Sequence, residues 1–124
     1  MEYEEASIAL DLKYYRMRIY RSTLQRLGEP KYIQFLVNPS KKRMGICSAD
    51  TMKMPDQTSR IDWRYLKNKS YIELKSKRFL LALCSEIPEM QMGHSYRLSG
   101  VIIPSEKIVI FPLENICCLE RGVQ

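Results

Sequence analysis

The sequence predicts an α+β protein: a small β-barrel-like domain made of two strand–helix–hairpin units that are related by pseudo-twofold symmetry. Three observations support this prediction. The 124 residues are 45% hydrophobic and 27% charged, as in an ordinary globular domain. Short β-prone runs between turn residues dominate the pattern. The same order of elements occurs twice, roughly in 13–50 and 71–113 with a connecting segment at 51–70, within one expected domain of 1–124.

The first unit follows an acidic lead-in, residues 1–12, which we expect to form a short strand or a helical turn with its glutamates in solvent. From Lys13 to Tyr20, large apolar and basic residues alternate with a period near two, which is typical of a half-buried strand. Arg16 and Arg18 would then lie on one face of this strand.

A short helix and a hairpin complete the first unit. Ser22 followed by Gln25 fits a capping box at the start of the helix. Gly28 can adopt the left-handed conformation that ends a helix. Two β-prone runs, 32–37 and 43–47, surround a segment that contains Asn, Pro and Ser, and this arrangement is typical of a hairpin.

The connecting segment has no clear period. Within it we expect a short strand at Ile61 to Leu66. Its Trp63 and Tyr65 alternate with charged residues, a pattern that can stack nucleobases. Aromatic residues in a loop more often dock that loop on the core, and we predict this role for both.

The second unit repeats the order of the first. We expect a strand at 71–75, a helix at 77–87 with one broad apolar face, and a hairpin formed by 96–103 and 107–113. The tail from Glu114 onward would pack as a last strand or a turn.

Equivalent residues recur in the two units. The pairs are Ile19 and Leu74 in the leading strands, Leu24 and Phe79 in the helices, and Met44 and Val109, with Ile46 and Phe111, in the hairpins. Two such units, each with one sheet face to bury, would close into a barrel and so remove exposed strand edges. The alternative is an ordinary α+β chain whose elements alternate by chance.

The formal net charge of +6 is unevenly distributed. Residues 13–43 carry nine Lys or Arg against one acidic residue, and residues 51–78 carry eight against three. Such asymmetry indicates a surface that faces a polyanion. Scattered, solvated lysines and arginines are the alternative.

The first unit resembles the swapped-hairpin half-barrel of the AbrB and MazE type of bacterial DNA-binding protein. The matching residues are Ile19, Arg21, Leu24, Leu27 and Gly28, and Tyr20 stands where the family prefers proline. The resemblance implies a barrel of two halves, normally supplied by two chains, that binds DNA through basic residues around the strand–helix junction. Here one chain would carry both halves.

Ten basic residues are predicted to bind nucleic acid. They are Arg16, Arg18, Arg21 and Arg26 at the first strand–helix junction, Lys41, Lys42 and Arg43 at the hairpin tip, and Lys75, Lys77 and Arg78 at the second junction. Arginines on a rigid strand can bind phosphates and can also present a bidentate fork to guanine edges. Basic residues at a hairpin tip are suited to positioning phosphates without sequence information.

Catalytic motifs are absent from the sequence, which has no nucleophile elbow, no Walker phosphate loop and no dinucleotide-binding glycine pattern. We expect the single histidine, His94, to be solvated rather than to act as a general base. The four cysteines match no zinc motif, and we interpret them as small hydrophobic residues. We expect neither a metal nor another cofactor.

The sequence therefore predicts a regulatory nucleic-acid-binding protein, in the style of a transcription factor or antitoxin, without catalytic activity; DNA is favoured as the partner, and RNA is the variant that the sequence leaves open. The alternative is a protein–protein interaction or scaffold module with dispersed charge and an exposed apolar patch, for which the methionines or Trp63 are suited. A homodimer or another protein partner is compatible with either function. The acidic N-terminus and the lack of a long apolar run predict a cytoplasmic protein that does not enter a membrane.

Overall fold

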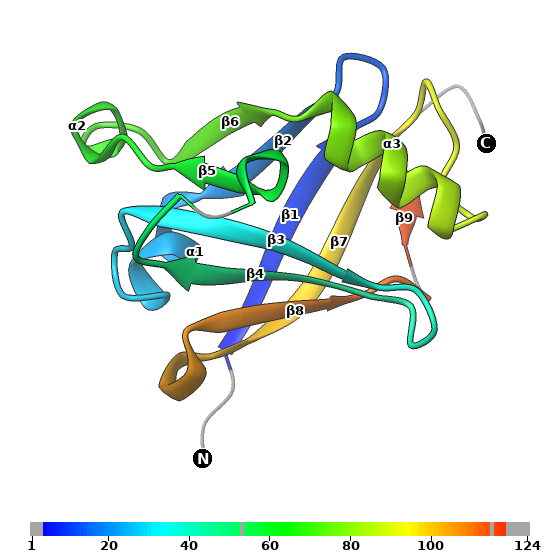
Figure 1. The fold of residues 1–124 in the computed structure, drawn as a ribbon. Helices are drawn as coiled ribbons and strands as arrows, with labels where there is room; N and C mark the ends of the chain where they lie inside the picture. The colour runs from blue at the N-terminus through cyan, green and yellow to red at the C-terminus, as the bar shows by residue number, and fades with distance from the viewer. Residues whose placement is uncertain (1–3, 53, 115, 119–124) are drawn as a thin grey trace.

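An antiparallel β-sheet curls into an almost closed barrel in the computed structural model of the protein (Figure 1). The structure describes residues 4–52, 54–114 and 116–118. Within these ranges the strands are β1 (Glu4–Asp11), β2 (Arg16–Tyr20), β3 (Tyr32–Asn38), β4 (Arg43–Ala49), β5 (Thr58–Arg60), β6 (Tyr71–Lys75), β7 (Ser95–Ile103), β8 (Ile108–Pro112) and β9 (Cys117–Cys118). The helices are α1 (Arg21–Arg26), α2 (Trp63–Leu66) and α3 (Lys77–Glu86), with short 3-10 helices η1 (Pro55–Gln57) and η2 (Pro104–Glu106). The sheet order is β5-β3-β4-β8-β7-β1-β2-β6, and β9 pairs with β7.

The acidic lead-in is an integral part of this sheet. β1 is an eight-residue strand that pairs with β2 on one side and with β7 on the other, so the strand alternative is correct and the helical turn is wrong. It turns Ile8 and Leu10 into the core. The side chain of Glu4 is partly in solvent, as expected, but its Oε2 also lies 2.6 Å from Nε of Arg26 in α1.

β2 confirms the predicted alternation over a shorter length. The expected strand begins at Lys13, whereas residues 12–15 form the turn that joins β1 to β2, with Tyr15 in the left-handed region at φ 57°. Beyond that turn Met17 and Ile19 enter the core, and the arginines that alternate with them point outward.

α1 ends as predicted but begins earlier. Gly28 has a φ of +91°, the left-handed conformation that stops the helix. The predicted capping box is wrong, because Ser22 is already the second residue of α1 and the N-cap is Tyr20, which makes no side-chain hydrogen bond. The backbone N–H of Arg21, one of the four donors in the first turn, is bonded to the carbonyl of Ser70 at 2.9 Å. The hairpin of β3 and β4 follows as predicted.

The connecting segment holds a short strand and a short helix at places that differ from the prediction. β5 pairs with β3, and the predicted strand from Ile61 to Leu66 is wrong because α2 occupies most of that range. The helix forms there because the carboxylate of Asp62 caps it, accepting hydrogen bonds from two backbone N–H groups. The indole of Trp63 donates a hydrogen bond to a backbone carbonyl that precedes β3, so this aromatic docks the loop as predicted. The same prediction is wrong for Tyr65, which is 53% exposed.

The second unit has the predicted elements. β6, α3, β7 and β8 lie within one residue of their expected bounds, and η2 forms the turn between β7 and β8. α3 packs on the barrel, where the ring centroid of Phe79 lies 5.2 Å from that of Phe35 on β3. The tail forms a last strand, β9.

Two strand pairs join the two units. β2 lies antiparallel to β6, and β4 lies antiparallel to β8. The sheet begins at β5 and ends at β6, and in the described part of the chain no pairing joins these two strands, which is why the barrel is not fully closed. The buried apolar side chains form one core cluster.

A close approach of β7 and β8 requires glycine at position 100. A Cβ atom on Gly100 would overlap the carbonyl oxygen of Ile110 and would lie 2.6 Å from Cδ1 of Phe111. Such distances are well inside van der Waals contact. The absence of a Cβ atom at Gly100 therefore permits the close approach of β7 and β8.

Candidate nucleic-acid interface

The outer surface of β7, β1, β2 and β6 carries a cluster of charged residues that we call the arginine face. It consists of Arg16, Arg18, Lys75 and Arg97, together with the acidic Asp11 and Glu73. Buried residues alternate with these side chains along the strands, so the sheet itself turns them outward. The strand register places them in two rows, Arg97–Ala9–Arg18–Glu73 and Asp11–Arg16–Lys75.

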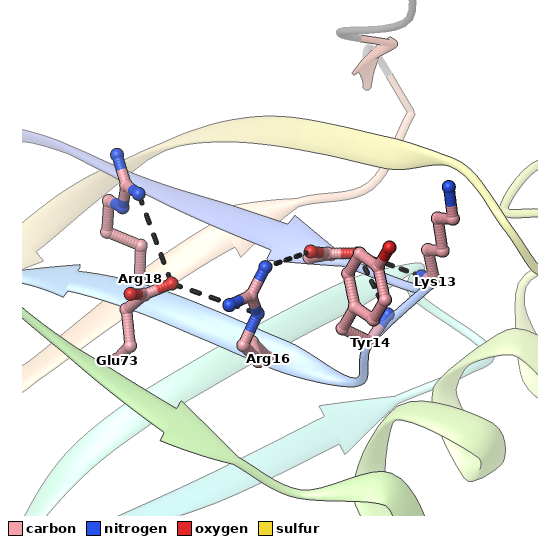
Figure 2. Close-up of polar contacts among 6 residues, drawn as sticks. Lys13, Tyr14, Arg16, Arg18 and Glu73 are labelled. Atoms are coloured by element: carbon pink, nitrogen blue, oxygen red, sulfur yellow. Dashed lines mark hydrogen bonds and ion pairs between the residues drawn. The ribbon is translucent and has the colours of Figure 1, made fainter.

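Two carboxylates hold the guanidinium groups of Arg16 and Arg18 (Figure 2). Oδ2 of Asp11 accepts a hydrogen bond from Nη2 of Arg16 at 3.0 Å. Oε2 of Glu73 lies 3.9 Å from Nε of Arg16 and 3.9 Å from Nη2 of Arg18, so both arginines share one carboxylate. Nε of Arg16 is buried and makes no hydrogen bond with any described residue. Glu73 therefore acts through its charge, because 3.9 Å is too long for a hydrogen bond.

The charges of this network are fixed near neutral pH. Burial by itself disfavours the charge of Asp11, but the backbone N–H groups of Tyr14 and Lys13 and the Arg16 guanidinium together lower the pKa of its carboxyl below the ordinary value. The hydrogen bond to Asp11, aided by the charge of Glu73, raises the pKa of the Arg16 guanidinium. With four cationic side chains against two carboxylates, the arginine face has a net positive charge.

Tyrosine rings adjoin the arginines. The guanidinium carbon of Arg18 lies 4.1 Å from the ring centroid of Tyr71, close enough for a cation–π interaction. Tyr14, in the turn between β1 and β2, is 57% exposed, and its ring centroid lies 5.1 Å from the guanidinium carbon of Arg16 (Figure 2). An exposed ring beside cationic groups is suited to stacking a nucleobase.

A shallow trough runs along β1 beside the arginines. The outward side chains of β1 are small here, Ser7 and Ala9, whereas β2 carries its arginines and Tyr20. A hollow of about 200 Å³ is lined by both Arg18 and Arg97, and a second hollow of about 570 Å³ continues along β1. The two hollows share Tyr20, so they adjoin. Cationic groups lie on both sides of the smaller hollow, where a polyanion can bind, whereas the lining of the larger hollow includes Glu5 and no lysine or arginine.

The other two predicted residues of the first junction make contacts elsewhere. Nη1 of Arg21 donates hydrogen bonds to the carbonyls of Leu66 at 3.2 Å and Lys67 at 3.0 Å. Arg26 faces Glu4 at 2.6 Å, although Oε2 of Glu4 is not aligned for a hydrogen bond. These contacts engage both guanidinium groups outside the arginine face.

The predicted residues of the hairpin tip lie on the turn between β3 and β4, at the end of the barrel away from α2 (Figure 1). Nζ of Lys42 lies 2.9 Å from Oε2 of Glu89. This hydrogen bond raises the pKa of the Lys42 ammonium and lowers the pKa of the Glu89 carboxyl. Lys41 and Arg43 are exposed.

The structure separates the three predicted residues of the second junction. Lys75 joins the arginine face, whereas Lys77 and Arg78 lie at the start of α3. Nζ of Lys77 is 5.3 Å from the ring centroid of Tyr15. Arg78 borders a hollow of about 350 Å³ that is otherwise lined mainly by apolar groups, among them Val37, Met54, Pro55, Phe79 and Ala82.

Arg97 is not among the residues predicted from the sequence. It lies opposite Ala9 on β1, and with strands about 4.8 Å apart its Cα is about 10 Å from that of Arg18 on β2. Its position between the buried Tyr96 and Leu98 marks it as outward-facing, and this signal could be found in the sequence. That Arg97 lies beside Arg18 could not be found in the sequence, because β7 is far from β1 and β2 in the chain.

Metal ligands do not cluster in the described ranges: no group of three or more His, Cys, Asp and Glu side chains there could hold a metal ion. Cys47 and Cys84 are free and half-buried, and burial raises the pKa of both thiols, which fits their interpretation as small hydrophobic residues. The side chains of Cys117 and Cys118 lie outside the described part of the structure. His94 is half-buried rather than fully solvated.

No protein-family model matches the chain, and no curated protein and no solved structure matches it significantly. The resemblance to the AbrB and MazE type therefore stays a prediction. None of the helices in the described residues has the length and apolar character needed to cross a membrane. The function is inferred below from the geometry of the arginine face.

Proposed function

We propose that the protein is a regulatory nucleic-acid-binding protein without catalytic activity and that the arginine face is its interface. One observation carries this proposal: Arg18 and Arg97 flank the small Ala9 at the trough on β1, and Arg16 lines the same hollow. Cationic groups on both sides of a trough fit a linear polyanion better than dispersed surface charges do.

The two carboxylates of the arginine face do not prevent such binding. The side chains of Arg16 and Arg18 are 36% and 42% exposed, and exposed ion pairs contribute only about 0.2–1 kcal/mol each. A phosphate can therefore replace a carboxylate beside a guanidinium at a small cost. Before a phosphate binds, the carboxylates restrain the guanidinium groups. This restraint reduces the conformational entropy lost on binding.

DNA is the proposed nucleic acid. The resemblance of the first unit to the AbrB and MazE type favours it, and RNA is the variant within the same class. Arg16 and Arg18 project from a paired strand, and such rigid arginines can bind phosphates or present a bidentate fork to guanine. The hairpin-tip residues Lys41 and Arg43 belong to the β3–β4 hairpin, which carries no residue of the arginine face, and they are left out of the proposed interface.

We also propose that the barrel is an internal duplication with pseudo-twofold symmetry. In this proposal β2 is equivalent to β6, β3 to β7 and β4 to β8. Two of these equivalent pairs lie side by side, since β2 pairs with β6 and β4 pairs with β8. In each unit the hairpin, β3–β4 or β7–β8, also follows the helix. The inward residues Met44 and Ile46 are matched by Val109 and Phe111. The symmetry would also relate β1 to β5, and here the units differ, since β1 has eight residues and β5 has three.

A salt titration of DNA binding tests the proposed function. The logarithm of the affinity for a duplex should fall with the logarithm of the salt concentration, with a slope of about −0.9 for each neutralised phosphate. Removing both arginines of β2, in Arg16→Ala/Arg18→Ala, should make this slope shallower by about two units. The control Lys41→Ala/Arg43→Ala removes the same charge from the β3–β4 hairpin, outside the arginine face, and should change the slope little.

Circular dichroism would establish that both double variants are folded. A slope near zero for the unmodified protein would reject nucleic-acid binding. Equal losses in the two variants would reject the arginine face as the interface, because binding would then depend on total charge alone.

A protein-interaction or scaffold function is the second candidate. The hollow beside α3 favours it, because Val37, Phe79 and Ala82 contribute apolar lining and Met54 is 54% exposed at the same place. In that case DNA binding would be absent at every salt concentration. Sedimentation analysis of an Ala82→Glu variant would then show whether the hollow joins two copies of the chain.

A further inference from the structure

Two adjoining hollows surround α2, the helix at the end of the barrel away from the β3–β4 turn (Figure 1). Their volumes are about 680 and 570 Å³, and Glu29, Trp63 and Arg64 line both of them. The exposed basic residues around these hollows are Lys31, Arg60, Arg64 and Lys67, which we call the α2 patch. None of the four is among the residues predicted from the sequence to bind nucleic acid.

The α2 patch differs from the arginine face in having no ion pair. Lys31, Arg60, Arg64 and Lys67 form no ion pair with the described acidic side chains. The acidic residues that line the hollows are Glu29 and Asp62, and the carboxylate of Asp62 is engaged in capping α2. The four cationic groups thus exceed the nearby carboxylates and are free to attract an anion.

The backbone that carries the α2 patch is held in place by contacts on both sides. Nε1 of Trp63 donates a hydrogen bond to the carbonyl of Pro30 at 2.8 Å. The guanidinium of Arg21 donates hydrogen bonds to the carbonyls of Leu66 and Lys67, and the side chain of Leu66 is fully buried. Charges on a fixed backbone lose less entropy on binding than charges on a free loop.

The arginine face and the α2 patch are connected by a stretch without acidic residues. β2 and β6 lie side by side, and the ends that carry Tyr20 and Tyr71 lead to the α2 loop (Figure 1). The chain contains no Asp or Glu in residues 16–28 or in residues 63–72. A polyanion that leaves the arginine face in this direction therefore meets no repelling carboxylate from these two segments.

We propose that the α2 patch is a second phosphate-binding surface, which holds the part of a nucleic acid that extends beyond the arginine face. This inference rests on the proposed function. The group recognised is the phosphodiester backbone, since exposed lysines and arginines neutralise phosphates without reading bases. The competing explanation is that basic residues at the short edge strand β5 only discourage pairing with another chain. They would then contribute nothing to binding.

The double variant Arg60→Gln/Arg64→Gln tests the inference, and Lys41→Gln/Arg43→Gln is its matched control. Each variant removes two exposed positive charges. The probes are DNA hairpin duplexes of about 6 and about 20 base pairs, which span roughly 20 and 70 Å at about 3.4 Å per pair.

On the long duplex, Arg60→Gln/Arg64→Gln should make the salt slope shallower by about 1.8 units and weaken binding about three- to tenfold. The control should do neither. On the short duplex, which the arginine face alone can hold, Arg60→Gln/Arg64→Gln should leave the affinity unchanged.

An unchanged slope on the long duplex, an equal loss in the control, or the same loss on the short duplex would each overturn the inference. If circular dichroism shows Arg60→Gln/Arg64→Gln to be unfolded, Lys31→Gln/Lys67→Gln removes two charges from the same patch and takes its place. Failure of the proposed function gives a different result, because Arg16→Ala/Arg18→Ala would then leave the affinity for both duplexes unchanged.

Discussion

The arginine face and the α2 patch carry the same kind of charge in different surroundings. On the arginine face, Asp11 and Glu73 neutralise part of the charge, and the hydrogen bond to Asp11 fixes the direction of Arg16. On the α2 patch, the cationic groups form no ion pair with the described carboxylates. Paired arginines have a defined orientation, which suits recognition, whereas unpaired cations provide attraction without direction. The difference indicates that one surface positions the nucleic acid and the other adds affinity.

The largest effect is expected on the stability of the fold, from a change in the packing of β7, the strand that carries Arg97 of the arginine face. Gly100→Ala places a Cβ against the carbonyl oxygen of Ile110 and 2.6 Å from Cδ1 of Phe111, so β7 has to move and Arg97 moves with it. We expect the free energy of unfolding, measured by urea denaturation, to fall by about 3 kcal/mol. Gly45→Ala is the control, since its added Cβ would lie no closer than 3.5 Å to any neighbour. Similar losses in both variants would contradict this account of β7.

An intermediate effect is expected on the affinity for DNA when a carboxylate is removed from the arginine face, because its arginines are then less neutralised, like the cations of the α2 patch. Glu73→Gln removes the carboxylate shared by Arg16 and Arg18 and keeps the size of the side chain. Because an exposed pair contributes up to about 1 kcal/mol, we expect the affinity for duplex DNA to rise about three- to fivefold. Fluorescence anisotropy with a labelled duplex measures this change.

The control for that experiment is Glu106→Gln, which removes one exposed negative charge from η2. It should raise the affinity much less than Glu73→Gln. An equal rise in both variants would show that net charge, rather than the release of Arg16 and Arg18, determines the affinity.

The smallest effect is expected from the pH dependence of the arginine face. The pKa of Asp11 is lowered in the folded state, so its charge stabilises the fold above the unfolded value of about 3.9, and this contribution is lost as the pH falls through the lower folded pKa. Between about pH 5 and pH 2, the unmodified protein should lose about 0.5–1 kcal/mol more stability than Asp11→Asn. Urea denaturation at several pH values measures the difference. Parallel pH profiles would show that the charge of Asp11 has no effect on stability.

Much of the fold could be predicted because its signals are local. β2, β6, α3 and the two hairpins each have their own periodicity or turn residues, and all lie close to their expected positions. α2 could also have been predicted, because Asp62 directly before Trp63 is a suitable N-cap. The length of β1 was harder to predict, because nothing in the acidic lead-in indicates a strand that pairs on both sides.

The candidate site was predictable only in part. The alternation in β2 places Arg16 and Arg18 on one face, as observed. Their neutralisation by Asp11 and Glu73 was not predictable, because Glu73 belongs to β6 and meets β2 only through the pairing of distant strands. Arg97 joins the same surface through β1 for the same reason.

By itself, the sequence determined which residues alternate, where the helices stop, and that the chain carries surplus positive charge. Each of these properties depends on residues a few positions apart. Only the tertiary structure decided which cations are neutralised, on the arginine face, and which stay unpaired, on the α2 patch. Strand order and register bring together residues that are far apart in the chain, and no local pattern specifies that register.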